Sequence, residues 1–360
     1  MRRTIFTPTA AGVSIMLLLS VLSVAQVSQV NQAIPGQGAP GQGLQLNINV
    51  SGTPVHIYPR ADKLQDLGAQ NNGGTPPLIY HGGPVMQTTT VYAIYWVPPH
   101  LQDGSATSLS AAYQNVQNTM LKEYFGHSLS TNNTQYYQGS SSKIYIKGTG
   151  SFGGSYVDTS LSPGKDCVDP SSELTNGSNC ISDADLQNEI KKVIALKKWT
   201  GGLNKMFLLF TSSDEGQCAT SGTSCSYANY CAYHSSFVNG SGQTVIYGND
   251  PYGDLNVCQL PGAPSPNKNP VADAAATAAS HELTEAITDP LGTAWYDSSG
   301  FEIGDECAYY YGNAGYLSGN ANEMWDGHPF LLQTEYSNVL QNFGIDALNY
   351  PGCFNAGPDL

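Results

Sequence analysis

Charged residues are scarce in this sequence, and most of those present are acidic. Asp, Glu, Lys and Arg make up 12% of the 360 residues, about half the share of an average globular domain. Fourteen basic residues stand against 28 acidic ones, which gives a formal net charge of −14. An acidic surface repels the phosphate backbone of nucleic acids, so the composition argues against nucleic acid as a partner.

The sequence also lacks the signatures of two large enzyme classes. It contains no G-x-S-x-G nucleophile elbow and no glycine-rich phosphate loop that leads into a helix. These absences argue against a serine hydrolase and against a nucleotide-dependent enzyme.

Basic residues are missing from the whole C-terminal part of the chain. From Asn269 to Leu360 there are thirteen Asp or Glu and no Lys or Arg. No basic side chain of this segment can neutralise its acids, so a bound metal ion is the simplest partner for them. The segment therefore predicts a cation site.

Apolar runs long enough for export or anchoring occur only at the N-terminus. Arg2 and Arg3 precede a mainly apolar run, Ala10–Leu22, which is followed by the small-x-small residues Ser23–Ala25. This order predicts a secretory signal peptide over residues 1–25, because the apolar run is too short to span a bilayer comfortably. The two arginines leave the general and the twin-arginine export routes open. We expect a secreted or periplasmic protein with no membrane span after cleavage.

The eight cysteines show no C-x-x-C spacing. An even number of cysteines in an exported chain favours disulfides over zinc thiolates or a catalytic thiol. Many pairings are possible, and we predict that near neighbours pair: Cys167–Cys180, Cys218–Cys225, Cys231–Cys258 and Cys307–Cys353.

The chain divides into a leader and one domain. Residues 26–77 are rich in Gln, Gly and Pro and predict a flexible leader, with a short β-like piece at Leu44–Tyr58. Residues 78–360 predict a single α+β domain with a mixed sheet. Its expected elements are a strand at Thr88–Val97, a helix at Ser108–Phe125, a short strand at Lys143–Lys147, a helix from Asp183 to Trp199, a strand at Met206–Thr211, a hairpin of Cys231–Val238 and Gln243–Gly248, and a final helix.

That final helix has clear boundaries. Asn269 is a good N-cap, and Pro270 suits the first helical position, where a missing N–H has no cost. The alanines that follow propagate a helix readily. Asp289 precedes a proline and is therefore pushed out of the helical region. The sequence predicts a helix from Asn269 to Asp289.

The second half of this helix carries H-E-L-T-E, from His281 to Glu285. Residues four apart project from one face, so His281 and Glu285 can hold one metal ion, as the first and fifth residues of H-E-x-x-H metallohydrolases hold zinc. Glu282 has the position of the glutamate that acts there as catalytic base. Asp289 adds another acid near the helix C-terminus, where the macrodipole disfavours negative charge. The alternative is a solvated acidic helix face.

A catalytic zinc ion needs a third protein ligand and one open position. Glu302 and Asp305 follow the helix in F-E-I-G-D-E-C, and we predict Glu302 as the ligand and Asp305 as a residue that orients another ligand. The reverse assignment is left open. A Ca²⁺ ion held by Asp297, Glu302 and Asp305 is the alternative.

Other side chains are candidates for the surroundings of the metal. His234, on the expected hairpin, and Asp289 could lie beside the cleft. His328 and Tyr336, in the tail, could each donate a hydrogen bond to an oxyanion. For each of them an ordinary structural role is the alternative.

Several motifs together resemble the phosphate-induced, or EXORDIUM-like, family of secreted proteins. The stretch Y-H-G-G-P-V-M at Tyr80–Met86 is similar to the family's opening signature, and C-A-Y-H at Cys231–His234 is also similar. The segments Ser280–Pro290, Trp295–Cys307 and Gln333–Asn338 resemble the bacterial branch, which carries the HExxE helix. The resemblance covers roughly residues 78–353 and implies export and a shared fold, and a link with the cell wall, more strongly than it implies a reaction.

The sequence thus predicts a secreted zinc-dependent hydrolase, in its simplest form a metallopeptidase that acts on an extracellular peptide or cell-wall substrate. The order of sheet, backing helix and metal helix resembles the zincin architecture, which is an analogy of fold. The alternative is a non-catalytic extracellular protein that binds cell-wall glycan or a protein partner and holds a structural Ca²⁺. The 22 tyrosines would suit a glycan-binding surface. The oligomeric state is left open.

Overall fold

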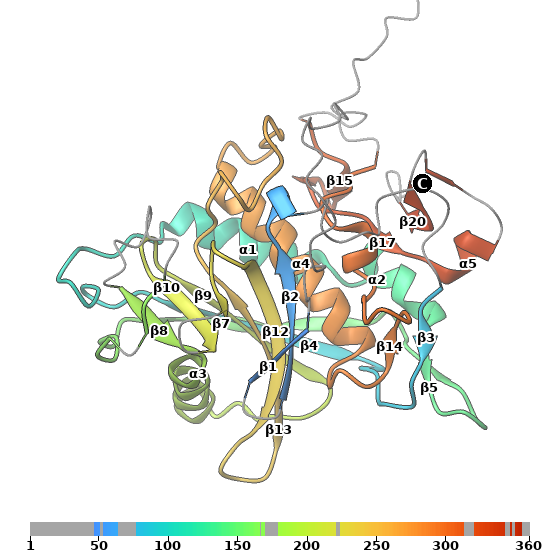
Figure 1. Ribbon diagram of the computed structural model, residues 1–360, viewed down its shortest axis with the longest axis horizontal. Helices are drawn as coiled ribbons and strands as arrows, with labels where there is room; N and C mark the ends of the chain where they lie inside the picture. The colour runs from blue at the N-terminus through green and yellow to red at the C-terminus, as the bar shows by residue number, and fades with distance from the viewer. Residues whose placement is uncertain are drawn as a thin grey trace, which may run out of the picture. The chain divides into compact units, whose positions relative to one another are not determined.

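The computed structural model describes residues 47–50, 53–63, 77–165, 167–169, 179–220, 224–312, 320–342, 346–347 and 350–354 (Figure 1). The predicted signal peptide and the first part of the predicted leader lie outside these ranges. In the part of the chain that is described, no helix is long and apolar enough to cross a membrane.

A seven-stranded mixed sheet forms the centre of the fold, which confirms the predicted α+β class (Figure 1). In spatial order the strands are β1 (Asn47–Val50), β2 (Thr53–Pro59), β12 (Tyr230–Val238), β13 (Thr244–Asp250), β9 (Lys205–Thr211), β4 (Thr89–Trp96) and β7 (Gly150–Asp158). Pairing is antiparallel from β1 through β2 and β12 to β13, and parallel from β13 through β9 and β4 to β7.

Helices cover both faces of the sheet, which is why its central strands are apolar throughout. Along β9, Met206 and Leu208 belong to the same core as residues of α1 (Ala111–Glu123) and α4 (Pro270–Thr288). Phe207 belongs to the opposite core, which contains residues of α3 (Asp183–Lys197). Successive side chains of a strand point to opposite faces, so the side chains of an uninterrupted apolar strand pack into both cores.

The remaining elements are short. The helices are α2 (Ser128–Asn132), α5 (Asn338–Asn342) and the 3₁₀ turns η2 (Asn133–Gln135) and η3 (Asp305–Cys307). The strands form one three-stranded sheet of β11 (Ser224–Cys225), β10 (Gly216–Thr220) and β8 (Cys180–Ser182), and the pairs β3 (Ile79–Tyr80) with β14 (Trp295–Tyr296), β5 (Tyr137–Gln138) with β6 (Ile144–Tyr145), β15 (Glu323–Trp325) with β16 (His328–Phe330), β17 (Glu335–Tyr336) with β20 (Cys353–Phe354), and β18 (Asp346–Ala347) with β19 (Tyr350–Pro351).

The four disulfides join the near neighbours that were predicted, and no cysteine among the described residues is free. The bond between Cys307 and Cys353 ties the C-terminal strand β20 to the end of η3. This bond fixes the C-terminal end of the segment that runs from α4 to η3.

The N-terminal boundary differs from the expected one. The β-like piece predicted at Leu44–Tyr58 is confirmed by β1 and β2, but these strands belong to the central sheet and not to a flexible leader. β2 pairs antiparallel with β12, with His56 opposite His234. The reason is burial, because Val55, Ile57 and Tyr58 are almost inaccessible to solvent. The ordered domain therefore begins before Pro77.

Candidate metal centre

Helix α4 is buried along nearly its whole length, and this burial determines the character of the site. The Asn269 side chain accepts a hydrogen bond from Ala272 N and Pro270 is the first helical residue, as the sequence predicts. The small alanines let neighbouring strands approach the helix closely. As a result, His281, Glu282 and Glu285 have no accessible surface. Glutamates are almost never fully buried without a compensating partner.

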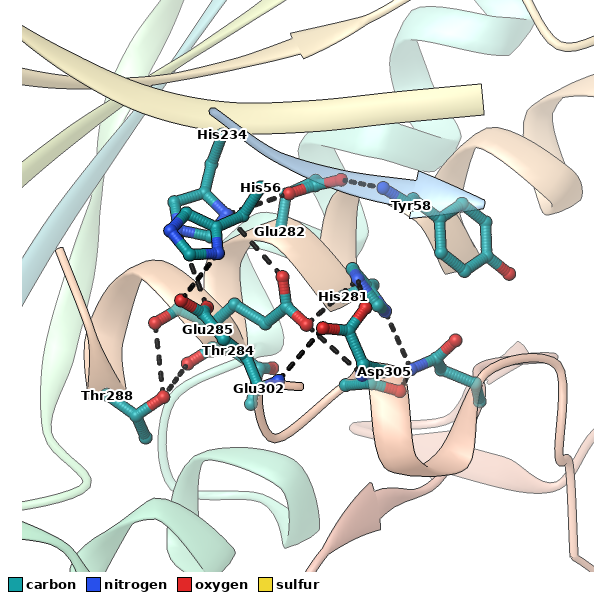
Figure 2. A network of polar contacts seen from close by, with 12 residues as sticks. His56, Tyr58, His234, His281, Glu282, Thr284, Glu285, Thr288, Glu302 and Asp305 are labelled. Atoms are coloured by element: carbon teal, nitrogen blue, oxygen red, sulfur yellow. Dashed lines mark hydrogen bonds and ion pairs between the residues drawn. The ribbon is translucent and has the colours of Figure 1, made fainter. Parts of the chain in front are cut away.

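Four separate segments bring seven ionisable side chains together around this helix (Figure 2). Each of the seven is at most 5% exposed. They are His56 from β2, His234 from β12, His281, Glu282 and Glu285 from α4, and Glu302 and Asp305 from the turn that leads into η3.

One half of the cluster lies around His281. Its Nε2 is 3.0 Å from Glu285 Oε1 and 3.8 Å from Asp305 Oδ1. One ligand atom from each of these three residues lies within 4.8 Å of the other two. The backbone N–H of Asp305 donates to Glu285 Oε1 over 3.1 Å, which fixes the turn against the helix. These atoms converge on one point, as the ligands of a single metal ion do.

The other half lies around His234. Its Nδ1 is 2.9 Å from Glu282 Oε2 and 3.5 Å from Glu285 Oε2, and its Nε2 is 3.6 Å from Glu302 Oε2. His56 stacks on the His234 ring, with 5.1 Å between centroids, and its Nδ1 is 2.9 Å from Glu302 Oε1. A second group of three ligand atoms lies within 4.8 Å of one another, with one atom each from His234, Glu282 and Glu285.

Gln333 contacts the second ring nitrogen of His281. Its Nε2 lies 2.9 Å from His281 Nδ1 and donates to Gly304 O over 3.0 Å, while its Oε1 accepts from Tyr309 N. In this arrangement the amide N–H faces Nδ1, so a neutral His281 carries its proton on Nε2. Ligation through Nε2 would require the proton to move to Nδ1 and the Gln333 amide to present its oxygen.

Burial keeps the three histidines neutral. It lowers the pKa of His56 to about 4 and that of His281 to about 4, and it lowers the pKa of His234 well below its usual value. A neutral imidazole has the lone pair that a metal ion needs. These rings are therefore potential ligands and not counter-charges for the acids.

Burial also raises the pKa of the four carboxyl groups, and for Glu282 and Glu302 the neighbouring acids raise it further. Among the described residues, the only basic side chains within 4 Å of these carboxylates are the neutral histidines, so no positive charge of the protein compensates them. The atoms without a hydrogen-bond partner include Oε2 of Glu285, Oε2 of Glu302, Oδ1 of Asp305 and Nε2 of His234. Unpartnered buried polar atoms cost free energy, and a cation would compensate for it. The donor set of imidazoles and carboxylates fits a divalent transition metal.

The other candidates from the sequence are His328, Tyr336 and Asp289. The side chain of His328 is 55% exposed and pairs with Glu123. The Tyr336 side chain is buried, and its carbonyl accepts from the hydroxyl of Tyr136. Asp289 ends α4, and its Oδ1 accepts from Thr293 N. Of these three residues, Asp289 acts on the cluster, because its negative charge raises the pKa of Glu285 and of Glu302.

Sequence reasoning missed His56, Tyr58 and Gln333. The backbone N–H of Tyr58 donates to Glu282 Oε1 over 3.2 Å, so β2 lies directly over the H-E-L-T-E segment. The alternation Val-His-Ile-Tyr at 55–58 was a strand signal, but the composition of the flanking residues pointed to a leader. Nothing in the local sequence indicated the contact of Gln333 with His281.

Gly304 is required by space and not by backbone conformation. Its φ of −81° suits any residue, but a Cβ there would lie 2.5 Å from His281 Nδ1 and 3.0 Å from Glu285 Oε1. We expect Gly304→Ala to displace the turn and to weaken metal affinity by about 10-fold or more, as changes beside metal ligands do. Isothermal titration calorimetry with Zn²⁺ measures the metal affinity of the variant and of the native chain.

The matched control for Gly304→Ala is Gly253→Ala, beside the start of α4. There a Cβ would meet Val271 O at 3.6 Å, an ordinary contact. We expect the control to bind metal like the native chain. Equal affinities of both variants and the native chain would show that the turn does not position His281.

Comparison of the chain with protein-family models, with curated proteins and with solved structures gives no match.

Proposed function

We propose that this protein is an exported, zincin-like metal-dependent hydrolase of the metallopeptidase class. The observation that carries the proposal is the convergence of His281, Glu285 and Asp305 in a buried site, where His281 Nε2 faces Glu285 Oε1 and the unpartnered Asp305 Oδ1. The sequence leaves open whether Glu302 or Asp305 is the third ligand. Asp305 Oδ1 lies 3.8 Å from His281 Nε2 and groups with His281 and Glu285, which favours Asp305.

The donor set favours zinc over calcium. Ca²⁺ prefers oxygen ligands, whereas imidazole nitrogen suits zinc and its transition-metal neighbours. When bound, such an ion polarises a carbonyl group and makes a water molecule more acidic. The two carboxylate ligands lower the net positive charge of the site, so we expect a weaker effect on water than in a site with three histidines.

Glu282 is the proposed proton acceptor. It neighbours His281 on α4, and its two oxygens are held by Tyr58 N and by His234 Nδ1. Burial raises its pKa, as suits a group that must take up a proton at neutral pH. Glu282 adjoins the proposed ligands, and both of its oxygens already accept hydrogen bonds. This arrangement supports a role in proton transfer and not in metal ligation.

Access to Glu282 depends on β2. The Tyr58 N–H occupies one carboxylate oxygen, and the strand covers this part of α4. A substrate therefore reaches Glu282 only when β2 moves away from it. An extended peptide could then pair with the free edge of β12 as β2 does.

The test is metal analysis of the mature protein after dialysis, combined with hydrolysis of a peptide library. We expect bound zinc in the native chain, loss of that zinc in Glu285→Ala, and cleavage that depends on the metal. A native chain that is correctly folded and binds neither zinc nor a related transition metal would disprove the proposal.

The second candidate is a non-catalytic extracellular protein that holds a structural ion. The complete burial of the cluster favours it, because substrates need access to a catalytic metal. The resemblance to EXORDIUM-like proteins, with their association with the cell wall, fits this candidate as well. Stable metal binding without cleavage of peptides or wall fragments, together with binding to isolated wall glycan, would support this candidate over the hydrolase.

A further inference from the structure

We propose that the cluster binds two divalent metal ions, with Glu285 as the bridge between them. This inference rests on the proposed metal site at His281, Glu285 and Asp305 and adds a second ion beside it. The second site consists of His56, His234 and Glu302.

The two carboxylate oxygens of Glu285 face different halves of the cluster. Oε1 lies 3.0 Å from His281 Nε2, and Oε2 lies 3.5 Å from His234 Nδ1. Figure 2 shows the Glu285 side chain extending between the His56–His234 pair and the His281–Asp305 pair. A carboxylate that presents one oxygen to each of two ligand groups is in the position of a bridging ligand.

The second half has its own set of unpartnered donor atoms. Nε2 of His56, Nε2 of His234, Oε2 of Glu302 and Oε2 of Glu285 lack a hydrogen-bond partner, whereas His56 Nδ1 and Glu302 Oε1 lie 2.9 Å apart and face each other. All four side chains are buried. One ion beside His281 would leave these atoms unsatisfied, so they require a second partner of their own.

The hydrogen bond between His234 and Glu282 prepares His234 for this role. When His234 Nδ1 donates its proton to Glu282 Oε2 over 2.9 Å, Nε2 keeps its lone pair and faces Glu302. A ligand histidine commonly donates its other N–H to a carboxylate in this way. Glu282 lies close enough to be a ligand itself, but both of its oxygens already accept hydrogen bonds, so we assign it to orient His234.

The charges of the cluster match two ions. Glu282, Glu285, Glu302 and Asp305 supply four carboxylates, the histidines are neutral, and no Lys or Arg among the described residues pairs with them. The buried acids Asp250, Asp289 and Glu335 add further negative charge around these four. One divalent ion can compensate at most two of these charges, whereas two ions can compensate four. Two-ion sites in hydrolases hold both the attacking and the leaving oxygen.

The experiment counts the ions. The full mature chain is stripped of metal, reloaded with Zn²⁺ or with Mn²⁺, dialysed and analysed for metal per chain. We expect two ions in the native chain, one in Glu302→Gln, and none in Glu285→Ala. With Mn²⁺, electron paramagnetic resonance should show a spin-coupled pair in the native chain and an isolated ion in Glu302→Gln.

Two further variants serve as controls. Glu189→Gln neutralises a buried glutamate of α3, away from the cluster, and should keep two ions. Glu282→Gln should also keep two, because a glutamine oxygen can still accept from His234. A native chain with one ion and no change of content in Glu302→Gln would overturn the second site and leave the proposed function intact. A native chain without metal would overturn both.

Discussion

Replacing Glu282 by glutamine is expected to lower the rate of peptide hydrolysis by about 10²–10⁴-fold, the usual contribution of a positioned general base. The amide cannot take up the proton of the attacking water, but its single oxygen can still accept the hydrogen bond from His234 Nδ1, while the bond from Tyr58 N to the other carboxylate oxygen is lost. Metal content should therefore not change. The measurement is the single-turnover rate of a cleaved peptide, with metal analysis of the same sample.

Glu189→Gln is again the matched control, since it makes the same chemical change in a buried glutamate elsewhere. It should hydrolyse the peptide at the native rate. Full activity in Glu282→Gln would refute the role of Glu282 as the base. Loss of metal from that variant would instead show that Glu282 is a ligand.

Removal of the metal with a chelator is expected to lower the unfolding temperature by roughly 10 °C. An ion present at a thousand times its dissociation constant contributes about 4 kcal/mol to the free energy of unfolding, which corresponds to about this shift in a domain of this size. The sign follows from the charges, because without a cation the four buried carboxylates of the cluster repel one another or must take up protons. Differential scanning calorimetry with and without chelator provides the measurement.

Glu285→Ala separates loss of metal from other effects of the chelator. This variant lacks the shared ligand, so it should unfold at a lower temperature than the native chain, and the chelator should not lower it further. Restoring zinc should return the native chain, but not the variant, to the higher temperature. An unfolding temperature of the native chain that does not respond to the chelator would argue against a metal that stabilises the fold.

The parts of the site that depend on local sequence were predictable. The boundaries of α4 follow from Asn269, Pro270 and Asp289, whose effects on the backbone act within one turn of the helix. The spacing of His281 and Glu285 follows from the helical repeat. The disulfides also join cysteines that are neighbours in sequence, so their order along the chain was sufficient.

The remainder of the site depends on contacts between distant segments. His56 reaches the cluster because β2 pairs with β12, across about half of the chain, and no local pattern records that pairing. The positions of Glu302 and Asp305 depend on the path of a turn held by the hydrogen bonds from Asp305 N to Glu285 and from Glu302 N to Asp305. Spacing in the sequence cannot decide which carboxylate of such a turn reaches His281.

The covalent link between β2 and the rest of the domain has a consequence for regulation. While the chain is intact, β2 is tethered next to β12 and competes with any incoming strand at a high effective concentration. A chain cut on the C-terminal side of β2 would leave it held by non-covalent contacts alone: its pairing with β12, its buried side chains and hydrogen bonds such as those from Tyr58 N to Glu282 and from the Tyr309 hydroxyl to Pro59 O. Dilution would then favour its release, and a single proteolytic event would uncover the H-E-L-T-E segment irreversibly.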